Sequence, residues 1–118
     1  MLSLGNITTD CDDVTKVSTF WSAVLGRPID EGANEYVAMI DRDNEAGPTW
    51  LFLKVPEGKA AKNRMHVDFH TDDLDAEVDR ILALGATRGD SHHEYGVQWT
   101  VLGDPEGNEF CVGRSDDA

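Results

Sequence analysis

The sequence contains little cysteine, few basic residues and no long apolar run. Its 118 residues include two cysteines, Cys11 and Cys111, which we expect to be reduced thiols, because so few cysteines cannot form a disulfide framework. Ten lysines and arginines stand against 23 aspartates and glutamates, which gives a net charge of −13. This charge argues against nucleic acid and against an anionic membrane surface as partners, since both bind basic surfaces.

Signals for membrane insertion or export are also missing. No apolar run approaches the ~20 residues of a membrane span, and the first residues lack a basic segment followed by an apolar one. We therefore expect a cytoplasmic protein. The sequence has no glycine-rich phosphate loop, no CxxC pair and no HExxH helix. Its length and its 40% of hydrophobic residues predict one domain with a core of its own.

Apolar residues recur at helical spacing in two segments. This pattern predicts helices at Asp13–Leu25 and Leu74–Leu84. An aspartate can cap each N-terminus, Asp12 or Asp13 in the first helix and Asp72 or Asp73 in the second. The residues of the first apolar stripe are Val14, Val17, Phe20, Trp21, Val24 and Leu25, and those of the second are Leu74, Val78, Ile81, Leu82 and Leu84.

The two helices belong to an internal repeat. Asp73 follows Asp13 by about 60 residues, which is half of the chain, so two copies of one unit fill the sequence. Each copy is predicted to read βαβββ. The predicted strands are Asn6–Cys11, Arg27–Glu31, Tyr36–Ile40 and Thr49–Val55 in the first copy, and His66–Thr71, Ala86–Arg88, Val97–Leu102 and Glu109–Val112 in the second.

Three groups of residues carry a family resemblance. They are Phe20-Trp21 with Leu25-Gly26, Val55-Pro56-Glu57 followed by Lys62-Asn63-Arg64-Met65-His66-Val67-Asp68, and Asp104-Pro105-Glu106-Gly107-Asn108-Glu109-Phe110-Cys111-Val112. With these motifs the chain resembles the glyoxalase-like branch of the vicinal oxygen chelate superfamily, which includes glyoxalase I, extradiol dioxygenases and bleomycin-resistance proteins. The resemblance implies an α+β fold. Two βαβββ modules, residues 1–58 and 62–118 of a single domain, would form open curled mixed sheets around a cavity, with the helices on the convex faces.

The resemblance also implies where a divalent metal would bind. Enzymes of the superfamily take one ligand from the first strand and one from the last strand of each module. The positions that match here are Asn6, His66, Cys111 and Leu53 or Lys54. His66 alone is a usual ligand, so we expect no standard metal site and no cofactor. An improvised site of His66, His70 and Glu109 is the alternative, with His66 as the candidate metal ligand.

Strand alternation places His66, Asp68 and His70 on one face of their strand, which we expect to be the cavity face. We favour a hydrogen-bonding role for His66 over a metal-binding one, and a small buried side chain for Cys111 over a nucleophile. The stretch His92-His93-Glu94 reads as a solvated loop. Trp50 and Trp99 lie on predicted strands, and one of them is expected to face the cavity.

Three functions remain open. The favoured one is metal-independent binding of a small polar or cationic molecule by Asn6, Thr8, His66, Asp68, Trp50, Trp99 and Cys111. The second is an enzyme of the same fold, a lyase, isomerase or dioxygenase, in which His66 is a metal ligand or a general base. The third is a non-catalytic interaction module. The size of the chain and the resemblance also predict a homodimer with an apolar contact.

Overall fold

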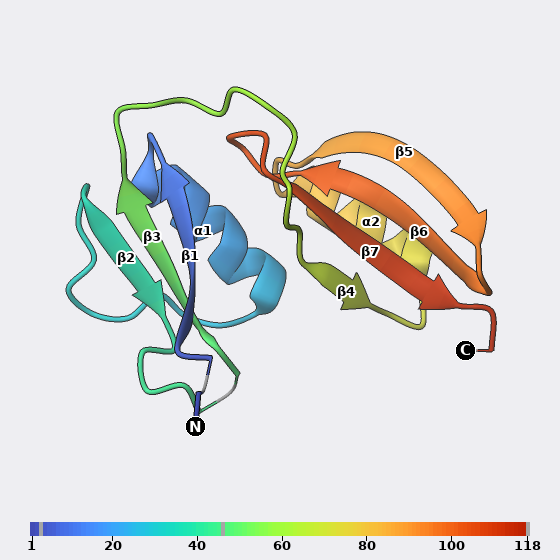
Figure 1. Cartoon of the computed structure of the whole chain (residues 1–118), viewed down its shortest axis with the longest axis horizontal. Helices are drawn as coiled ribbons and strands as arrows, with labels where there is room; N and C mark the ends of the chain where they lie inside the picture. Colours follow the sequence, from blue (N-terminus) through green and yellow to red (C-terminus); the bar gives the residue numbers. More distant parts are fainter. Residues whose placement is uncertain (3, 46, 118) are drawn as a thin grey trace. The chain divides into compact units, whose positions relative to one another are not determined.

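The computed structural model describes residues 1–2, 4–45 and 47–117, and the chain divides into two units, Met1–Gly58 and Lys59–Ala118. Each unit begins with a strand that is followed by a helix, as the sequence repeat predicts (Figure 1). The elements of the first unit are β1 (Asn6–Cys11), α1 (Val14–Leu25), β2 (Val37–Ile40) and β3 (Thr49–Lys54). Those of the second unit are β4 (Asp68–His70), α2 (Leu74–Ala83), β5 (Thr87–Glu94), β6 (Val97–Gly103) and β7 (Glu109–Ser115).

The two sheets follow one plan. In the first unit the strand order is β1-β3-β2, and in the second it is β4-β7-β6-β5. The first strand of each unit pairs in parallel with the last one, and every other strand pair is antiparallel. The described residues thus form two helices and seven strands in two mixed open sheets, which confirms the predicted α+β fold class.

Each helix starts at an aspartate cap and packs on its own sheet. The Asp13 carboxylate accepts the Lys16 N–H at 3.1 Å, and the Asp73 carboxylate accepts the Ala76 N–H at 3.1 Å. These bonds satisfy N–H groups that have no partner within the helix. Gly26 ends α1 in the left-handed conformation, with φ 67°. In the described part of the chain, no helix has the length and apolarity needed to cross a membrane.

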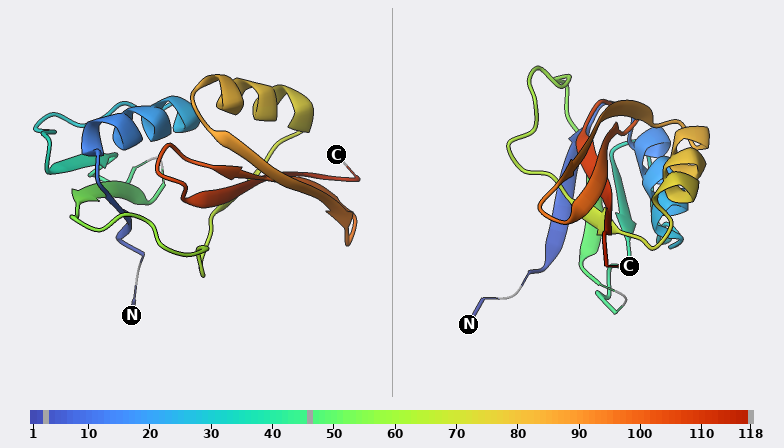
Figure 2. Two further views of the ribbon diagram at one scale, coloured as in Figure 1. Left: turned by 90° about the horizontal axis from the view of Figure 1, so that it is seen from above. Right: turned by 90° about the vertical axis from the view of Figure 1, so that its right-hand side faces the viewer.

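Each helix covers one face of its own sheet (Figure 2). In the first unit, the Trp21 ring lies 5.1 Å from the Trp50 ring, centroid to centroid. The other buried apolar residues of this core are Cys11, Val14, Val17, Phe20, Ala38, Ile40 and Phe52. The core of the second unit is built from Val78, Ile81, Leu102, Phe110 and Val112. The apolar stripes read from the sequence therefore supply both cores.

The prediction of a strand at Arg27–Glu31 is wrong. This segment makes only an isolated bridge, between Ile29 and Ile40. Pro28 has no N–H to donate to a ladder, which limits pairing on its side. Beyond the bridge, the Asp30 carboxylate accepts the backbone N–H of Arg42 at 2.8 Å, a local contact in place of a continued ladder. The first unit therefore reads βαββ, although the Arg27–Glu31 segment bridges to β2 as β5 pairs with β6 in the second unit.

The prediction of a short strand at Ala86–Arg88 and of a loop at His92–Glu94 is also wrong. Strand β5 runs over Thr87–Glu94 and includes all three residues of the predicted loop. All of its residues are exposed, so no apolar alternation marks it in the sequence. The register on β6 shifts between Arg88 and Ser91, and this irregularity further hides the pattern.

The paired strands β4 and β7 also differ at their ends from the prediction. Strand β4 is limited to Asp68–His70, within the predicted His66–Thr71, whereas β7 continues past the predicted Val112 to Ser115. The extra residues of β7 are glycine, arginine and serine, which carry no apolar pattern. They are held by pairing with β6, since Ser115 lies opposite Val97.

The capping geometry predicts a difference between two neighbouring aspartates. Asp73→Ala removes the α2 cap and should lower the free energy of unfolding by about 1 kcal/mol. Asp72→Ala removes the adjacent exposed carboxylate and should change it by less than about 0.5 kcal/mol. Urea denaturation followed by circular dichroism measures both values. Equal losses in the two variants would contradict the assignment of the cap to Asp73.

Candidate functional site

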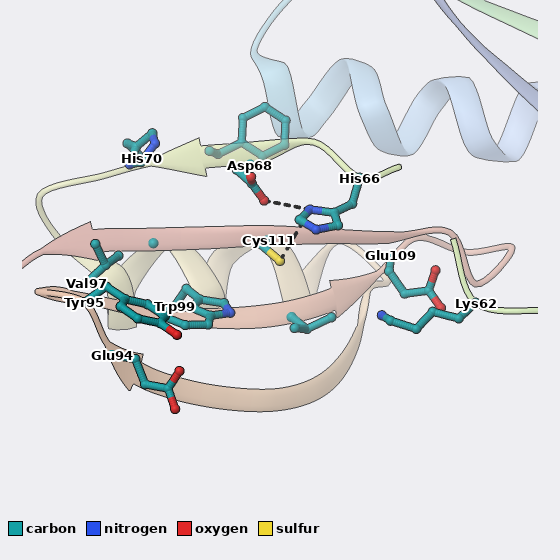
Figure 3. Close-up of a pocket in the computed structure, with 13 residues that line it drawn as sticks. Lys62, His66, Asp68, His70, Glu94, Tyr95, Val97, Trp99, Glu109 and Cys111 are labelled. Atoms are coloured by element: carbon teal, nitrogen blue, oxygen red, sulfur yellow. Dashed lines mark hydrogen bonds and ion pairs between the residues drawn. The ribbon is translucent and has the colours of Figure 1, made fainter. Parts of the chain in front are cut away.

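A pocket of about 410 Å³ lies within the second unit, on the face of its sheet that α2 does not cover. Alternation along the strands produces this face. In β6 and β7 one set of side chains packs into the core, and the alternate set points to the pocket. The lining residues are Lys62, His66, Asp68, Phe69, His70, Glu94, Tyr95, Val97, Trp99, Val101, Glu109, Cys111 and Gly113 (Figure 3).

Gly113 forms part of the pocket wall because it has no side chain. It lies opposite Trp99 on β6 and opposite His70 on β4. A Cβ at this position would stand 3.4 Å from the Trp99 Cβ and 3.3 Å from the Gln98 carbonyl oxygen. A glycine therefore keeps the space between the His70 and Trp99 side chains open.

A polar cluster of His66, Asp68 and Cys111 lies along the β4–β7 pairing (Figure 3). Asp68 is the register partner of Cys111, so their side chains share a face of the sheet. The His66 Nδ1 lies 2.8 Å from the Asp68 Oδ1 and 4.0 Å from the Cys111 Sγ. Because a carboxylate only accepts hydrogen bonds, this contact places a proton on Nδ1, and in the neutral imidazole Nε2 is then the acceptor.

The Cys111 thiol is held in its protonated form. Burial raises its pKa, and the nearby Asp68 carboxylate raises it further through its charge and its hydrogen bond, while the Lys62 ammonium opposes the shift. A thiolate is the reactive form of cysteine. The geometry thus favours a neutral thiol in the pocket wall, in keeping with the predicted buried side chain.

Glu109 fastens the segment before β4 to the start of β7. Its carboxylate accepts the backbone N–H of Asn63 at 2.9 Å and lies 3.4 Å from the Lys59 Nζ. The Asn63 amide in turn donates to the Glu109 carbonyl oxygen at 3.0 Å. The bond from the Asn63 N–H is the main cause of the lowered pKa of Glu109, and Lys59 adds to it. These contacts hold the chain that leads to His66 against the sheet.

The structure brings together four of the seven predicted ligand-binding residues. His66, Asp68, Trp99 and Cys111 all line the pocket. Trp50 does not face it: this side chain is 5% exposed and packs on Trp21 in the core of the first unit. Of the two tryptophans, Trp99 is therefore the one that reaches the site, because its strand position falls on the open face of the sheet.

The remaining two predicted residues belong to the other unit. Asn6 and Thr8 lie on the exposed face of β1, where the Asn6 amide donates to the Thr8 hydroxyl at 2.7 Å. The improvised metal site of His66, His70 and Glu109 is not the group that the structure assembles. The donor atoms that converge, all within 4.8 Å of one another, belong to His66, Asp68 and Cys111, whereas the Glu109 carboxylate is bound to Asn63 and Lys59.

Sequence reasoning missed several lining residues, namely Lys62, Phe69, Glu94, Tyr95, Val97, Val101 and Gly113. A signal for three of them was available. Val97 and Val101 have the same parity as Trp99 on β6, and Gly113 has that of Cys111 on β7. Glu94 and Tyr95 gave no comparable signal, since they follow the polar strand β5 that the apolar pattern does not show.

The comparisons with known proteins agree with this fold. The family described as Glyoxalase-like domain matches residues 6–113. The chain therefore belongs to the glyoxalase-like family, and the resemblance read from its motifs is confirmed. No curated protein is similar enough to the sequence to count as a match.

Solved structures of low sequence identity share the fold. A glyoxalase/bleomycin resistance protein/dioxygenase family enzyme from Burkholderia phytofirmans PsJN is 19% identical, with a TM-score of 0.80 over 97% of this chain and 99% of that chain. A lactoylglutathione lyase from Agrobacterium tumefaciens is 18% identical, with a TM-score of 0.66 over 97% and 94%. A mutant of the fosfomycin resistance protein FosX from Listeria monocytogenes, complexed with Mn(II) and 1S,2S-dihydroxypropylphosphonic acid, is 16% identical, with a TM-score of 0.78 over 95% and 89%.

The effect of Asp68 on the Cys111 thiol predicts that removing the Asp68 charge changes the reactivity of this cysteine. Asp68→Asn removes the charge that raises the pKa of Cys111, so more thiolate is present at mildly alkaline pH. Alkylation of Cys111 by iodoacetamide should become roughly two- to tenfold faster. Peptide mass spectrometry measures the rate, with the buried Cys11 as an internal reference.

Glu94→Gln is the matched control, because it removes one carboxylate from another part of the same pocket. It should leave the Cys111 rate within about twofold of the wild-type rate. An unchanged rate in Asp68→Asn would contradict the role of Asp68.

Proposed function

We propose that the protein binds a small polar or cationic organic molecule in the pocket of its second unit, without a metal ion. The observation that carries this proposal is the combination of an apolar wall with polar groups directed into the same space. Trp99, Val97 and Val101 form the wall, and the His66–Asp68 pair lies beside it. Pockets of about 300–1,000 Å³ with such a lining are typical of small-molecule sites, and this pocket of about 410 Å³ falls in that range.

The charges of the lining favour a polar or positively charged ligand. Asp68, Glu94 and Glu109 contribute carboxylates, and Lys62 is the one lysine or arginine among the lining residues. The Glu109 charge is already offset by Lys59, whereas Asp68 and Glu94 have no lysine or arginine ion-pair partner among the described residues. The net charge of −13 adds a long-range attraction for cations. The FosX structure, with its bound dihydroxypropylphosphonic acid, supports small-molecule binding by a related fold.

Metal independence is supported by the donor atoms of the site. The resemblance implies a metal held by nitrogen and oxygen donors, whereas the converging atoms here are one nitrogen, one oxygen and one sulfur. The Nδ1 of His66 is engaged by Asp68 at 2.8 Å, and the raised pKa of Cys111 disfavours the thiolate that a metal requires. The set therefore does not fit the site of nitrogen and oxygen donors that the resemblance implies.

Ligand binding is tested by a thermal-shift screen of polar and cationic metabolites and antibiotics. A molecule that binds only the folded state raises the apparent stability, by about 2.7 kcal/mol at a concentration 100 times its Kd. For each hit, His66→Ala and Asp68→Asn should weaken binding about fivefold or more, since each removes a polar contact. Glu57→Gln, which removes an exposed carboxylate outside the pocket, should leave the affinity unchanged. A screen without a single hit would refute the proposal.

Dialysis against a chelator tests metal independence. We expect metal content at background in the purified protein and the same ligand affinity before and after dialysis, because the raised pKa of Cys111 and the hydrogen bond on His66 Nδ1 disfavour an ion at this site. Elemental analysis by plasma mass spectrometry measures the content. A stoichiometric metal that is lost in both His66→Ala and Cys111→Ser would overturn metal independence and leave ligand binding to be judged by the screen.

A second candidate function is an enzyme in which His66 acts as a general base. The hydrogen bond from Nδ1 to Asp68 favours it, because it fixes the imidazole tautomer and leaves the Nε2 lone pair free to accept a proton. In this case Asp68 positions the ring, and the substrate must bring an acidic proton to Nε2. Turnover of a screening hit by the wild type, with loss of turnover in His66→Ala, would distinguish this enzyme from a binding protein.

A further inference from the structure

The turn between β5 and β6 holds a tyrosine in an unusual backbone conformation. Glu94 and Val97 are register partners, so Tyr95 and Gly96 form a two-residue hairpin loop. Tyr95 has φ 56° and Gly96 has φ 75°, so both lie in the left-handed region, as in a type I′ turn. Asn, Asp or Gly usually occupies the first position of this turn, because a bulky side chain is strained there.

Packing against the described residues of the unit does little to offset this strain. The Tyr95 side chain is 93% exposed, although it lines the pocket together with Glu94 and Trp99. Figure 3 shows the three side chains together at the hairpin end of the pocket, with Lys62 and Glu109 at the other end. An asparagine would serve the turn better and leave less apolar surface in water. Strained residues of this kind cluster at active sites and ligand clamps, which points to a bound molecule at Tyr95.

The neighbours of Tyr95 indicate what that molecule is. Trp99 presents a half-buried indole, whose ring is stacked on His92 with centroids 5.0 Å apart and planes inclined by 27°. The Glu94 carboxylate is exposed, and no hydrogen bond or ion pair with another described residue engages it. Aromatic rings attract cations through their faces, and a carboxylate beside them adds a charge of the matching sign.

We propose that Tyr95, Trp99 and Glu94 form the subsite for a flat organic cation. The rings contact the plane of the ligand, and Glu94 neutralises its charge. This inference rests on the proposed function and specifies the class of ligand. It also makes a distinctive prediction: because Tyr95 strains the turn and contacts the ligand, replacing it should strengthen the fold and weaken the complex.

The ligand class is tested with three flat two-ring probes of similar size. N-methylquinolinium is a cation, quinoline is neutral near neutral pH, and naphthoate is an anion. Nitrogen–proton correlation spectra follow the indole signals of the three tryptophans, and the signal missing from Trp99→Phe identifies Trp99. We expect the cation to shift the Trp99 signal at a concentration about fivefold or more below that required by either other probe. The signals of Trp21 and Trp50, which are buried in the other unit, should not move.

The variants separate the ring from the backbone strain. Tyr95→Asn should raise Tm by about 3 °C and weaken binding of N-methylquinolinium about fivefold or more. Tyr95→Phe keeps both the ring and the strain, so its Tm and affinity should stay close to those of the wild type. Tyr36→Asn, at an exposed tyrosine with ordinary φ in the other unit, is the matched control and should neither raise Tm nor weaken binding. Glu94→Gln should weaken binding of N-methylquinolinium and leave the affinity for quinoline unchanged.

The results that overturn the inference are distinct from those that overturn the proposed function. Equal or tighter binding of quinoline or naphthoate refutes the cation subsite and leaves small-molecule binding intact. Absence of any shift with the three probes refutes the subsite too, while the thermal-shift screen still decides the function. If Tyr95→Asn leaves probe affinity unchanged but abolishes a dimer seen by light scattering, Tyr95 is a contact between two copies of the chain and the inference is wrong.

Discussion

The pairing of β7 between β4 and β6 controls the chemistry of the second unit. Hydrogen bonds on both sides fix its register, with Asp68 and Val101 as the two partners of Cys111. Because side chains alternate along a strand, this register sends Phe110 and Val112 into the core and Cys111 to the open face. A shift by one residue would exchange the two sets and remove both the core and the pocket.

The same alternation explains how the unit combines stability with an open site. The buried face of the sheet and the apolar stripe of α2 supply the contacts of the core, so the other face can remain open. That face carries Trp99, Gly113 and the His66–Asp68 pair, which are arranged around space rather than packed together. Glu109 adds a local restraint, since its bonds to Asn63 and Lys59 tie the segment before His66 to β7.

The helices and the first strand were predictable because their signals are local. The apolar residues of α1 recur at helical spacing over three turns, and Asp13 and Asp73 cap their helices with side chains three residues from the N–H groups they bind. Most of strand β5 was missed for the opposite reason. Its residues are polar and exposed, so it is defined by hydrogen bonds to β6 and by the Tyr95-Gly96 turn. The predicted strand at Arg27–Glu31 failed because Pro28 and local side-chain bonds limit it to one bridge.

The sequence by itself determined the family, the two helix-containing repeats and the placement of His66 and Asp68 on one face, because motifs and periodicity are properties of neighbouring residues. Tertiary structure alone decided which tryptophan reaches the pocket and which donor atoms meet. Trp50 and Trp99 occupy similar positions in predicted strands, yet one packs on Trp21 and the other lines the open face. Cys111 meets His66 across 45 residues of sequence because β7 pairs with β4. Such contacts depend on the register between distant strands, which local patterns do not specify.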